Sequence, residues 1–200
     1  MFDSLVLSTQ AGILLITDDL PTRVLSRVVG GAGGAWLHRI FGIALDQRRI
    51  DMDTFINWSA QLVNAGHNYI GVSGAVLARA FRLDAKKGKA PGYLFSSLSK
   101  IIGGKFAEPR SHIEACIECL RDLWTDGDTQ VHCQQASGLL LRQLIRERHE
   151  DYYPIILAVF LGVKHIPQLA KYIIGRKAIS FLILDAAANC CCLGCRSFGN

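Results

Sequence analysis

The pattern of hydrophobic residues near the start of the chain changes abruptly at two acidic residues. Residues 13–16 are apolar without interruption, and Asp18 and Asp19 follow after a single threonine. A short continuous apolar run bounded by polar residues is consistent with a buried strand. We therefore predict a β-strand over residues 13–17 with both carboxylates at its carboxyl end, where open α/β sheets gather ligands and metal ions. Because 12 residues precede the run, we expect no earlier strand to supply partner acids.

The residues after the two acids change to helical spacing. Pro21 suits a first helical turn, and the glycine-rich residues 30–34 interrupt the pattern. Apolar residues then recur at intervals of three and four, which indicates a series of amphipathic helices. The expected N-caps are Asp18 or Asp19, Asp51 or Asp53, and Ser73. The helical stripes lie within residues 1–12, 24–29, 36–44, 55–63, 76–81, 94–102, 113–124, 140–145, 153–165, 168–174 and 179–187.

The chain is expected to divide at a basic, flexible stretch. Residues 85–92 contain three lysines, two glycines and a proline but no large apolar residue, which is typical of a linker. We predict a small α/β part in residues 1–84 and an all-helical region in residues 93–187. Residues 188–200 hold four of the seven cysteines and differ in composition from the rest, so we predict a disordered tail. The predicted fold class is mostly α with a small α/β part.

Composition narrows the class of protein. Half of the residues are hydrophobic and 20% are charged, which is typical of a globular chain. The net charge of +5 permits contact with a polyanion but does not indicate a dedicated nucleic-acid binder. The start of the chain lacks a secretory pattern, and the apolar residues 154–163 cover about half of a bilayer span. We therefore expect a cytoplasmic protein with reduced thiols and no membrane contact.

The first 84 residues resemble a known family. Residues 15–19, Leu-Ile-Thr-Asp-Asp, followed by Arg23, resemble the late strand of a PIN domain. Residues 36–45, 47–51, 55–70 and 73–81 resemble the later elements of the same family in the same order. The resemblance covers residues 3–84. Residues 103–105, 111–113 and 138–145 are similar to a helical extension in some large bacterial PIN-domain proteins.

The resemblance implies a truncated PIN-like α/β domain followed by an all-helical region. PIN domains are metal-dependent nucleases in which three or four acids hold Mg²⁺ or Mn²⁺, usually to cut RNA. Hard cations prefer carboxylate oxygens, and a bound ion activates water as a nucleophile. Asp18 and Asp19 match the acids after the late strand of that family. The resemblance therefore implies that both are catalytic residues and metal ligands, with Asp19 favoured.

The same resemblance implies that this chain alone is inactive. The first strand of the family with its acid, and the early helix with its glutamate, have no counterpart here. Adjacent carboxylates on a strand point to opposite faces and hold a catalytic ion poorly. We expect a fragment or decayed remnant of a PIN ribonuclease, with RNA as a partner only in an intact parent. The alternative is a non-catalytic helical module that binds a partner protein.

Other residues that could carry chemistry are expected to be structural. Cys116 and Cys119 form a CxxC motif one turn after His112, and such residues can bind zinc. Cys116 continues an apolar stripe, however, which favours buried thiols over a zinc site. His38 and His67 have no evident partner for acid–base chemistry. Phosphate-binding loops, dinucleotide glycine fingerprints and a Ser/His/Asp order are not found.

Two groups of basic residues are expected to face solvent. One lies in the linker, and in the other arginines alternate with glutamates, as on an exposed helix face. They comprise Lys86, Lys87 and Lys89, and Arg142, Arg146, Arg148 and His149.

Overall fold

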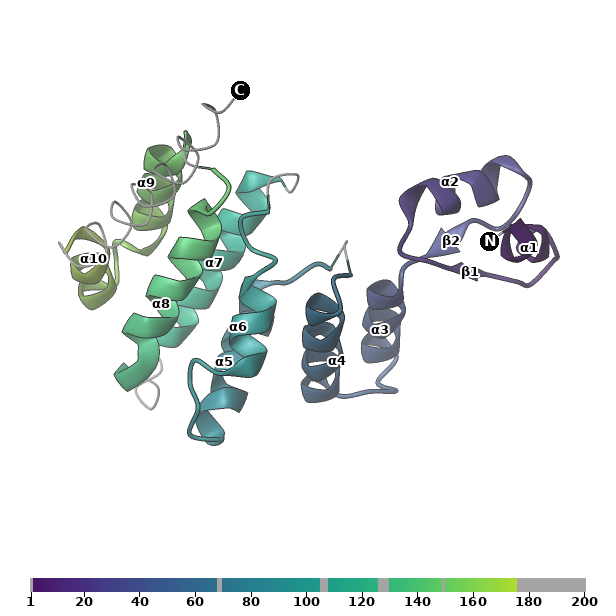
Figure 1. Cartoon of the computed structure of the whole chain (residues 1–200). Helices are drawn as coiled ribbons and strands as arrows, with labels where there is room; N and C mark the ends of the chain where they lie inside the picture. The colour runs from purple at the N-terminus through teal and green to yellow at the C-terminus, as the bar shows by residue number, and fades with distance from the viewer. Residues whose placement is uncertain (1, 68–69, 105–107, 126–129, 149, 176–200) are drawn as a thin grey trace, which may run out of the picture. The chain divides into compact units, whose positions relative to one another are not determined.

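A computed structural model describes residues 2–67, 70–104, 108–125, 130–148 and 150–175 (Figure 1). Helices dominate these residues, and the two strands among them form one small parallel sheet. The expected class, mostly α with a small α/β part, is confirmed. The chain forms two compact units, Met1–Gly71 and Val72–Asn200.

The first unit contains a βαβ motif that follows a short helix. Strands β1 (Leu15–Ile16) and β2 (Gly34–Ala35) pair in parallel, with Leu15 opposite Gly34 and Ile16 opposite Ala35. Helix α2 (Leu20–Val28) makes the crossover between them and packs on β2, while α1 (Phe2–Leu7) packs on α2. Two further helices, α3 (Leu37–Asp46) and α4 (Met52–Asn64), pack on each other.

The predicted strand exists, but its burial was predicted wrongly. β1 has two residues instead of five, and Leu15 alone of the apolar run is buried. Ile13, Leu14 and Ile16 are exposed by 38%, 52% and 56%. A strand of a parallel sheet is normally covered on both faces, whereas here the face opposite Leu15 is open. Strand β2 was not predicted, because two residues after a glycine-rich turn give no periodic signal.

Local capping follows the sequence closely. Asp19 caps α2 by accepting the Thr22 N–H at 2.9 Å, and Pro21 lies in the first turn. Asp51, and not Asp53, caps α4. Ser73 caps α5 (Gly74–Lys86) in the second unit. The predicted caps are therefore confirmed. They could be predicted because a capping side chain binds a backbone N–H group only two or three residues further along the chain.

The second unit is built from helices alone within the described residues. After α5 come α6 (Tyr93–Ser99), α7 (Pro109–Thr125), α8 (Gln130–Ile145), α9 (Tyr152–Val163) and α10 (Pro167–Ile174). α7 is the central element, because α5, α8 and α9 all pack on it. Among the large side chains of this unit that are fully buried, α5 to α8 and the turn after α6 supply Leu77, Phe81, Leu94, Phe95, Leu98, Ile102, Leu120, Leu123, Leu140, Leu141 and Leu144. Val159 and Val163 of α9 and Leu169 of α10 are fully buried as well.

The observed division of the chain differs from the expected one. It falls between Gly71 and Val72, and not in residues 85–92. The basic stretch is a tight connection between α5 and α6 inside the second unit. The buried carboxylate of Asp84 holds this connection in place, because it accepts hydrogen bonds from the backbone N–H groups of Gly92, Leu94 and Phe95.

Two expectations lie outside the described residues. These are the helix within residues 179–187 and the disordered tail, residues 188–200. Among the helices that the structure does describe, none combines the length and the apolar character needed to cross a bilayer.

Candidate functional site

Asp19 lies at the carboxyl end of β1, as predicted, and its carboxylate is engaged with α2. It accepts the Thr22 N–H at 2.9 Å and contacts the Thr22 hydroxyl. The hydroxyl bond and the backbone bond of Thr22 are the main reasons why the pKa of this carboxyl lies below its usual value, with a smaller contribution from Arg23. Asp19 therefore serves as a helix cap in this structure.

Asp18 connects three parts of the first unit. Its Oδ1 accepts the backbone N–H of Leu37 at 3.4 Å, at the start of α3. Its Oδ2 contacts Nδ1 of His67, which follows α4. The expectation that His67 lacks a partner for acid–base chemistry was wrong. The two residues are 49 positions apart, and only the fold brings them together.

The two aspartates and His67 line one open hollow of about 390 Å³. Its other walls are the first residues of α2 and the turn after α4: Leu20, Pro21, Ala65 and Gly66. Two carboxylates and an imidazole could contribute to a cation site or to proton transfer. Among the residues that the structure describes, no group of three or more His, Cys, Asp or Glu side chains has the arrangement of a metal site.

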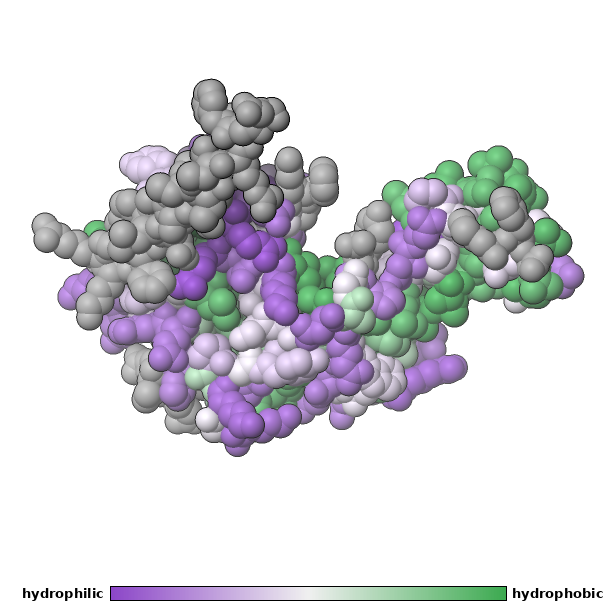
Figure 2. Space-filling model, viewed as in Figure 1, coloured by the Kyte–Doolittle hydropathy of each residue, from purple (hydrophilic) through white to green (hydrophobic). Residues whose placement is uncertain are grey.

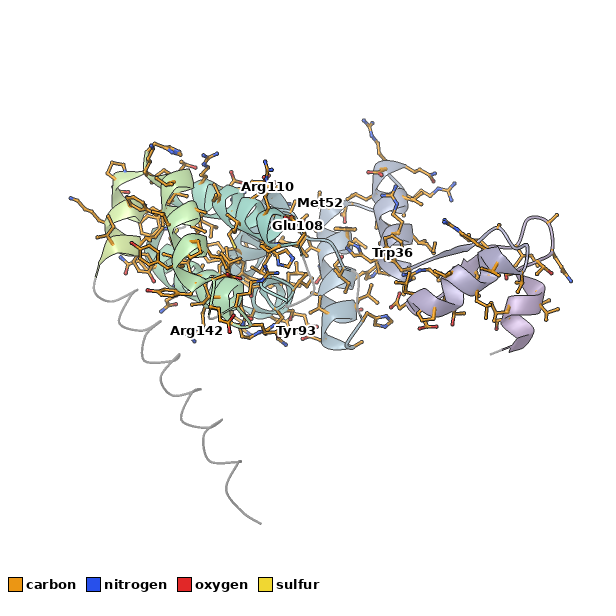
Figure 3. All side chains as sticks on the ribbon, turned by 90° about the horizontal axis from the view of Figure 1, so that it is seen from above. Trp36, Met52, Tyr93, Glu108, Arg110 and Arg142 are labelled. Carbon is orange, nitrogen blue, oxygen red and sulfur yellow. The ribbon has the colours of Figure 1, made fainter. Side chains whose placement is uncertain are left out.

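Arg23 holds the end of β1 in place. Its Nη1 donates to the carbonyl oxygen of Thr17 at 2.8 Å, and the guanidinium lies 5.0 Å from the ring centroid of Trp36. Trp36, labelled in Figure 3, is the residue before α3. Arg23 entered the sequence prediction only through the resemblance to a PIN domain. Its buried position gives it a structural role, which is to fix the strand end that carries Asp18 and Asp19.

The outer face of α2 is the second feature of this unit that could serve a function. The helix buries Thr22, Arg23 and Ser26. Leu20 and Val24 are 45% and 53% exposed, and the other exposed apolar side chains on or next to α2 are Leu25, Val28 and Val29. The apolar face predicted from the sequence therefore points away from the rest of the unit. Figure 2 shows hydrophobic residues over the part of the chain that Figure 1 labels α2.

The CxxC motif of α7 lies in the apolar core of the second unit. Cys116 and Cys119 are fully buried, and burial raises the pKa of both thiols. His112 accepts the Gly103 N–H at 2.9 Å with Nδ1. Burial, with a smaller contribution from Arg148, lowers the pKa of His112. The prediction that Cys116 continues an apolar stripe is confirmed.

One basic residue predicted on an exposed helix face is buried instead. α8 ends at Ile145, so Arg148 lies beyond the helix. Its Nη2 donates to the Gly104 carbonyl oxygen at 2.9 Å. Arg146 remains partly exposed and contacts the Lys100 carbonyl oxygen. The alternation of arginines with glutamates suggested one exposed helix face, but α8 ends at Ile145, before most of the alternating residues.

Comparison with protein-family models, with curated proteins and with solved structures gave no match for this chain. The described residues define it as a mostly helical protein that carries a small βαβ motif.

Proposed function

We propose that this chain is a non-catalytic protein-interaction module that docks a polypeptide on the outer face of α2. The observation that carries the proposal is the inverted burial of this helix. Leu20, Val24 and Val28 are four residues apart and lie along one side, which is exposed. Thr22 and Ser26 lie on the opposite side and are buried. A large exposed apolar face on a folded unit is typical of an interaction site.

Hydrogen bonds keep α2 in this orientation. The Ser26 hydroxyl lies 2.9 Å from that of Ser8 and donates to the Gly33 carbonyl oxygen at 3.4 Å. Arg23 is bonded to Thr17 and stacks on Trp36. Turning α2 to bury its valines would leave these buried polar groups without partners, and each such group costs about 1–3 kcal/mol. A second polypeptide is therefore the favourable way to cover the apolar face.

Site-specific photo-crosslinking tests this proposal. With benzoylphenylalanine in place of Val24, the full-length chain in the cells that express it should form covalent adducts with protein, because the probe lies in the proposed interface. The same probe in place of Gln47 should form none. Gln47 is a matched control because it is an exposed residue of the same unit. Equal labelling at both positions, or none at Val24, would contradict the proposal. The measurement is the mass of the adducts on denaturing gels.

Metal-dependent RNA cleavage by an intact parent protein is the second candidate function. It is favoured by the position of Asp18 and Asp19 at the carboxyl end of a parallel strand, where both line one open hollow. In that parent, Asp19 and Asp18 would bind Mg²⁺ or Mn²⁺ together with acids from another segment. The bound ion would activate water and neutralise phosphate charge.

A thermal-shift measurement tests whether this chain retains a cation site. If it does, millimolar Mn²⁺ should raise the Tm of the wild-type chain by a few degrees, since a ligand that binds only the folded state stabilises it. The double variant Asp18→Asn/Asp19→Asn should lose this rise. Asparagine also caps helices well, so the variant should keep its fold in the absence of metal. A wild-type Tm that is insensitive to Mn²⁺ would count against a metal role for this chain.

A further inference from the structure

We infer that His112 is a proton-sensitive latch, which holds the turn after α6 against α7 in neutral solution and releases it in mildly acidic solution. The turn, residues 100–104, joins α6 to the segment before α7 in the second unit. The inference therefore does not depend on the interaction function proposed for α2. Three features support it: the hydrogen bond of His112, the charges around its ring, and the packing of the turn.

The hydrogen bond between Gly103 and His112 requires a neutral imidazole ring. The backbone N–H of Gly103 donates to Nδ1 of His112 at 2.9 Å. A ring nitrogen can accept only when it carries no proton, so the single proton of the neutral ring lies on Nε2. A second proton would turn Nδ1 into a donor that faces another donor. Protonation therefore removes this bond and replaces it with repulsion.

The surroundings of the ring oppose that second proton. His112 is partly buried, and burial is the main reason why its pKa lies below the usual value for histidine. Arg148, which follows α8, lowers the pKa further, whereas Glu108, which precedes α7 and is labelled in Figure 3, raises it by a smaller amount. Among the described residues, these are the two charged groups that act on the ring. The latch is therefore closed in neutral solution.

A charge on His112 would disturb a second anchor of the turn. The Arg148 guanidinium is buried and donates from Nη2 to the carbonyl oxygen of Gly104 at 2.9 Å. An imidazolium would repel this guanidinium as well as the N–H of Gly103. Protonation therefore acts on both glycines of the turn at once.

The packing of the turn leaves it one way to respond. A Cβ atom at Gly103 would lie 1.9 Å from the carbonyl oxygen of Gln143, so the turn already touches the backbone of α8 and cannot shift toward it. The turn can relieve the repulsion only by moving away from α7 and α8. Ile102, which is fully buried in the closed turn, would then become exposed.

The direction of the pH dependence follows from proton linkage. In the released turn, His112 regains its usual pKa of about 6.5, so the released form binds more protons than the closed form. The stabilisation by the latch is fully present above about pH 6.5 and is lost as the pH falls below it. The ratio of released to closed turn rises by at most about tenfold for each pH unit.

NMR spectroscopy of the isotope-labelled, full-length chain tests the inference. The ring signals of His112 should titrate with a midpoint below about pH 6.5, and the amide signal of Gly103 should change with the same midpoint. Between about pH 7 and about pH 5, the protection of this amide against hydrogen exchange should fall at least about threefold, after correction for the intrinsic exchange rate. A midpoint at or above the usual value, or a Gly103 signal that does not follow the ring, would overturn the inference.

His112→Asn is the matched variant. Oδ1 of asparagine and Nδ1 of histidine are both attached to Cγ, so asparagine can accept the same N–H but does not titrate in this range. The protection of the Gly103 amide should therefore be the same at both pH values. An equal loss of protection in the wild-type chain and the variant would assign the pH dependence to another group.

Urea separates release of the turn from unfolding of the whole unit. Leu120 is fully buried in α7, so its amide should exchange only when the unit unfolds. Release of the turn exposes little surface, so about 0.5 M urea should accelerate exchange at Leu120 but not at Gly103. If urea accelerated both amides equally, the turn would open only with the whole unit, and His112 would not be a latch.

Discussion

Replacing Asp84 with alanine should destabilise the second unit by about 3–4 kcal/mol. The carboxylate is buried and accepts N–H groups of Gly92 at 3.1 Å, Leu94 at 3.3 Å and Phe95 at 2.9 Å. These groups lie at the start of α6, where no carbonyl of the helix can reach them. Alanine removes all three acceptor contacts and leaves buried donors without partners. We expect the Tm to fall by about 10 °C, measured by circular dichroism.

Asp84→Asn is the matched control. One oxygen, Oδ2, binds Gly92 and Phe95, and the other, Oδ1, binds Leu94. Asparagine keeps one acceptor oxygen, so it should retain the two bonds of Gly92 and Phe95 and lose about half as much stability as alanine. If both variants melted at the wild-type temperature, the residues between α5 and α6 would be a flexible linker, as the sequence alone suggested.

Replacing Gly103 with alanine should have a still larger effect, about 4 kcal/mol or more. Gly103 has φ = +82°, a backbone conformation that costs other residues about 1–2 kcal/mol. A Cβ atom there would lie 1.9 Å from the carbonyl oxygen of Gln143. The obstacle is the backbone of α8, which cannot move without disturbing the core. The displaced turn would also lose the bond from Gly103 to His112.

Gly104→Ala is the control for that prediction. Among the described residues, the atom nearest to a Cβ at Gly104 would be the Ile101 carbonyl oxygen at 3.7 Å, which is ordinary contact. We expect the free energy of unfolding of Gly104→Ala, measured by urea titration, to lie within about 1 kcal/mol of the wild-type value. Equal stability of the Gly103→Ala and Gly104→Ala variants would show that the turn after α6 is not packed against α8.

The local features of the fold could be predicted from the sequence, because the interactions that form them join residues only a few positions apart. Asp19, Asp51 and Ser73 cap helices because each reaches an N–H group three residues away. The stripe that contains Cys116 predicted its burial because apolar residues at helical spacing share a face. The position of Asp18 and Asp19 after a strand was predicted for the same reason, although β1 is shorter than expected.

The composition of the candidate site depended on contacts that no local pattern encodes. Nothing in the sequence near His67 indicates that it contacts Asp18, because the contact spans 49 residues. Arg148 was assigned to a solvated helix face, yet it is buried because α8 ends before it. In both cases the sequence supplied the residue type, and the meeting of distant segments decided what the side chain does.

The sequence by itself determined the helical character, the caps, and the carboxylates that follow the first strand, because these depend on neighbours a few residues away. The tertiary structure alone decided where the chain divides and which side of α2 faces solvent. Asp84 joins α5 to α6 through buried hydrogen bonds, and the bonds of Ser26 and Arg23 hold the polar side of α2 inward. Periodicity reveals that a helix has an apolar face, but the polar groups packed behind α2 determined that this face points outward.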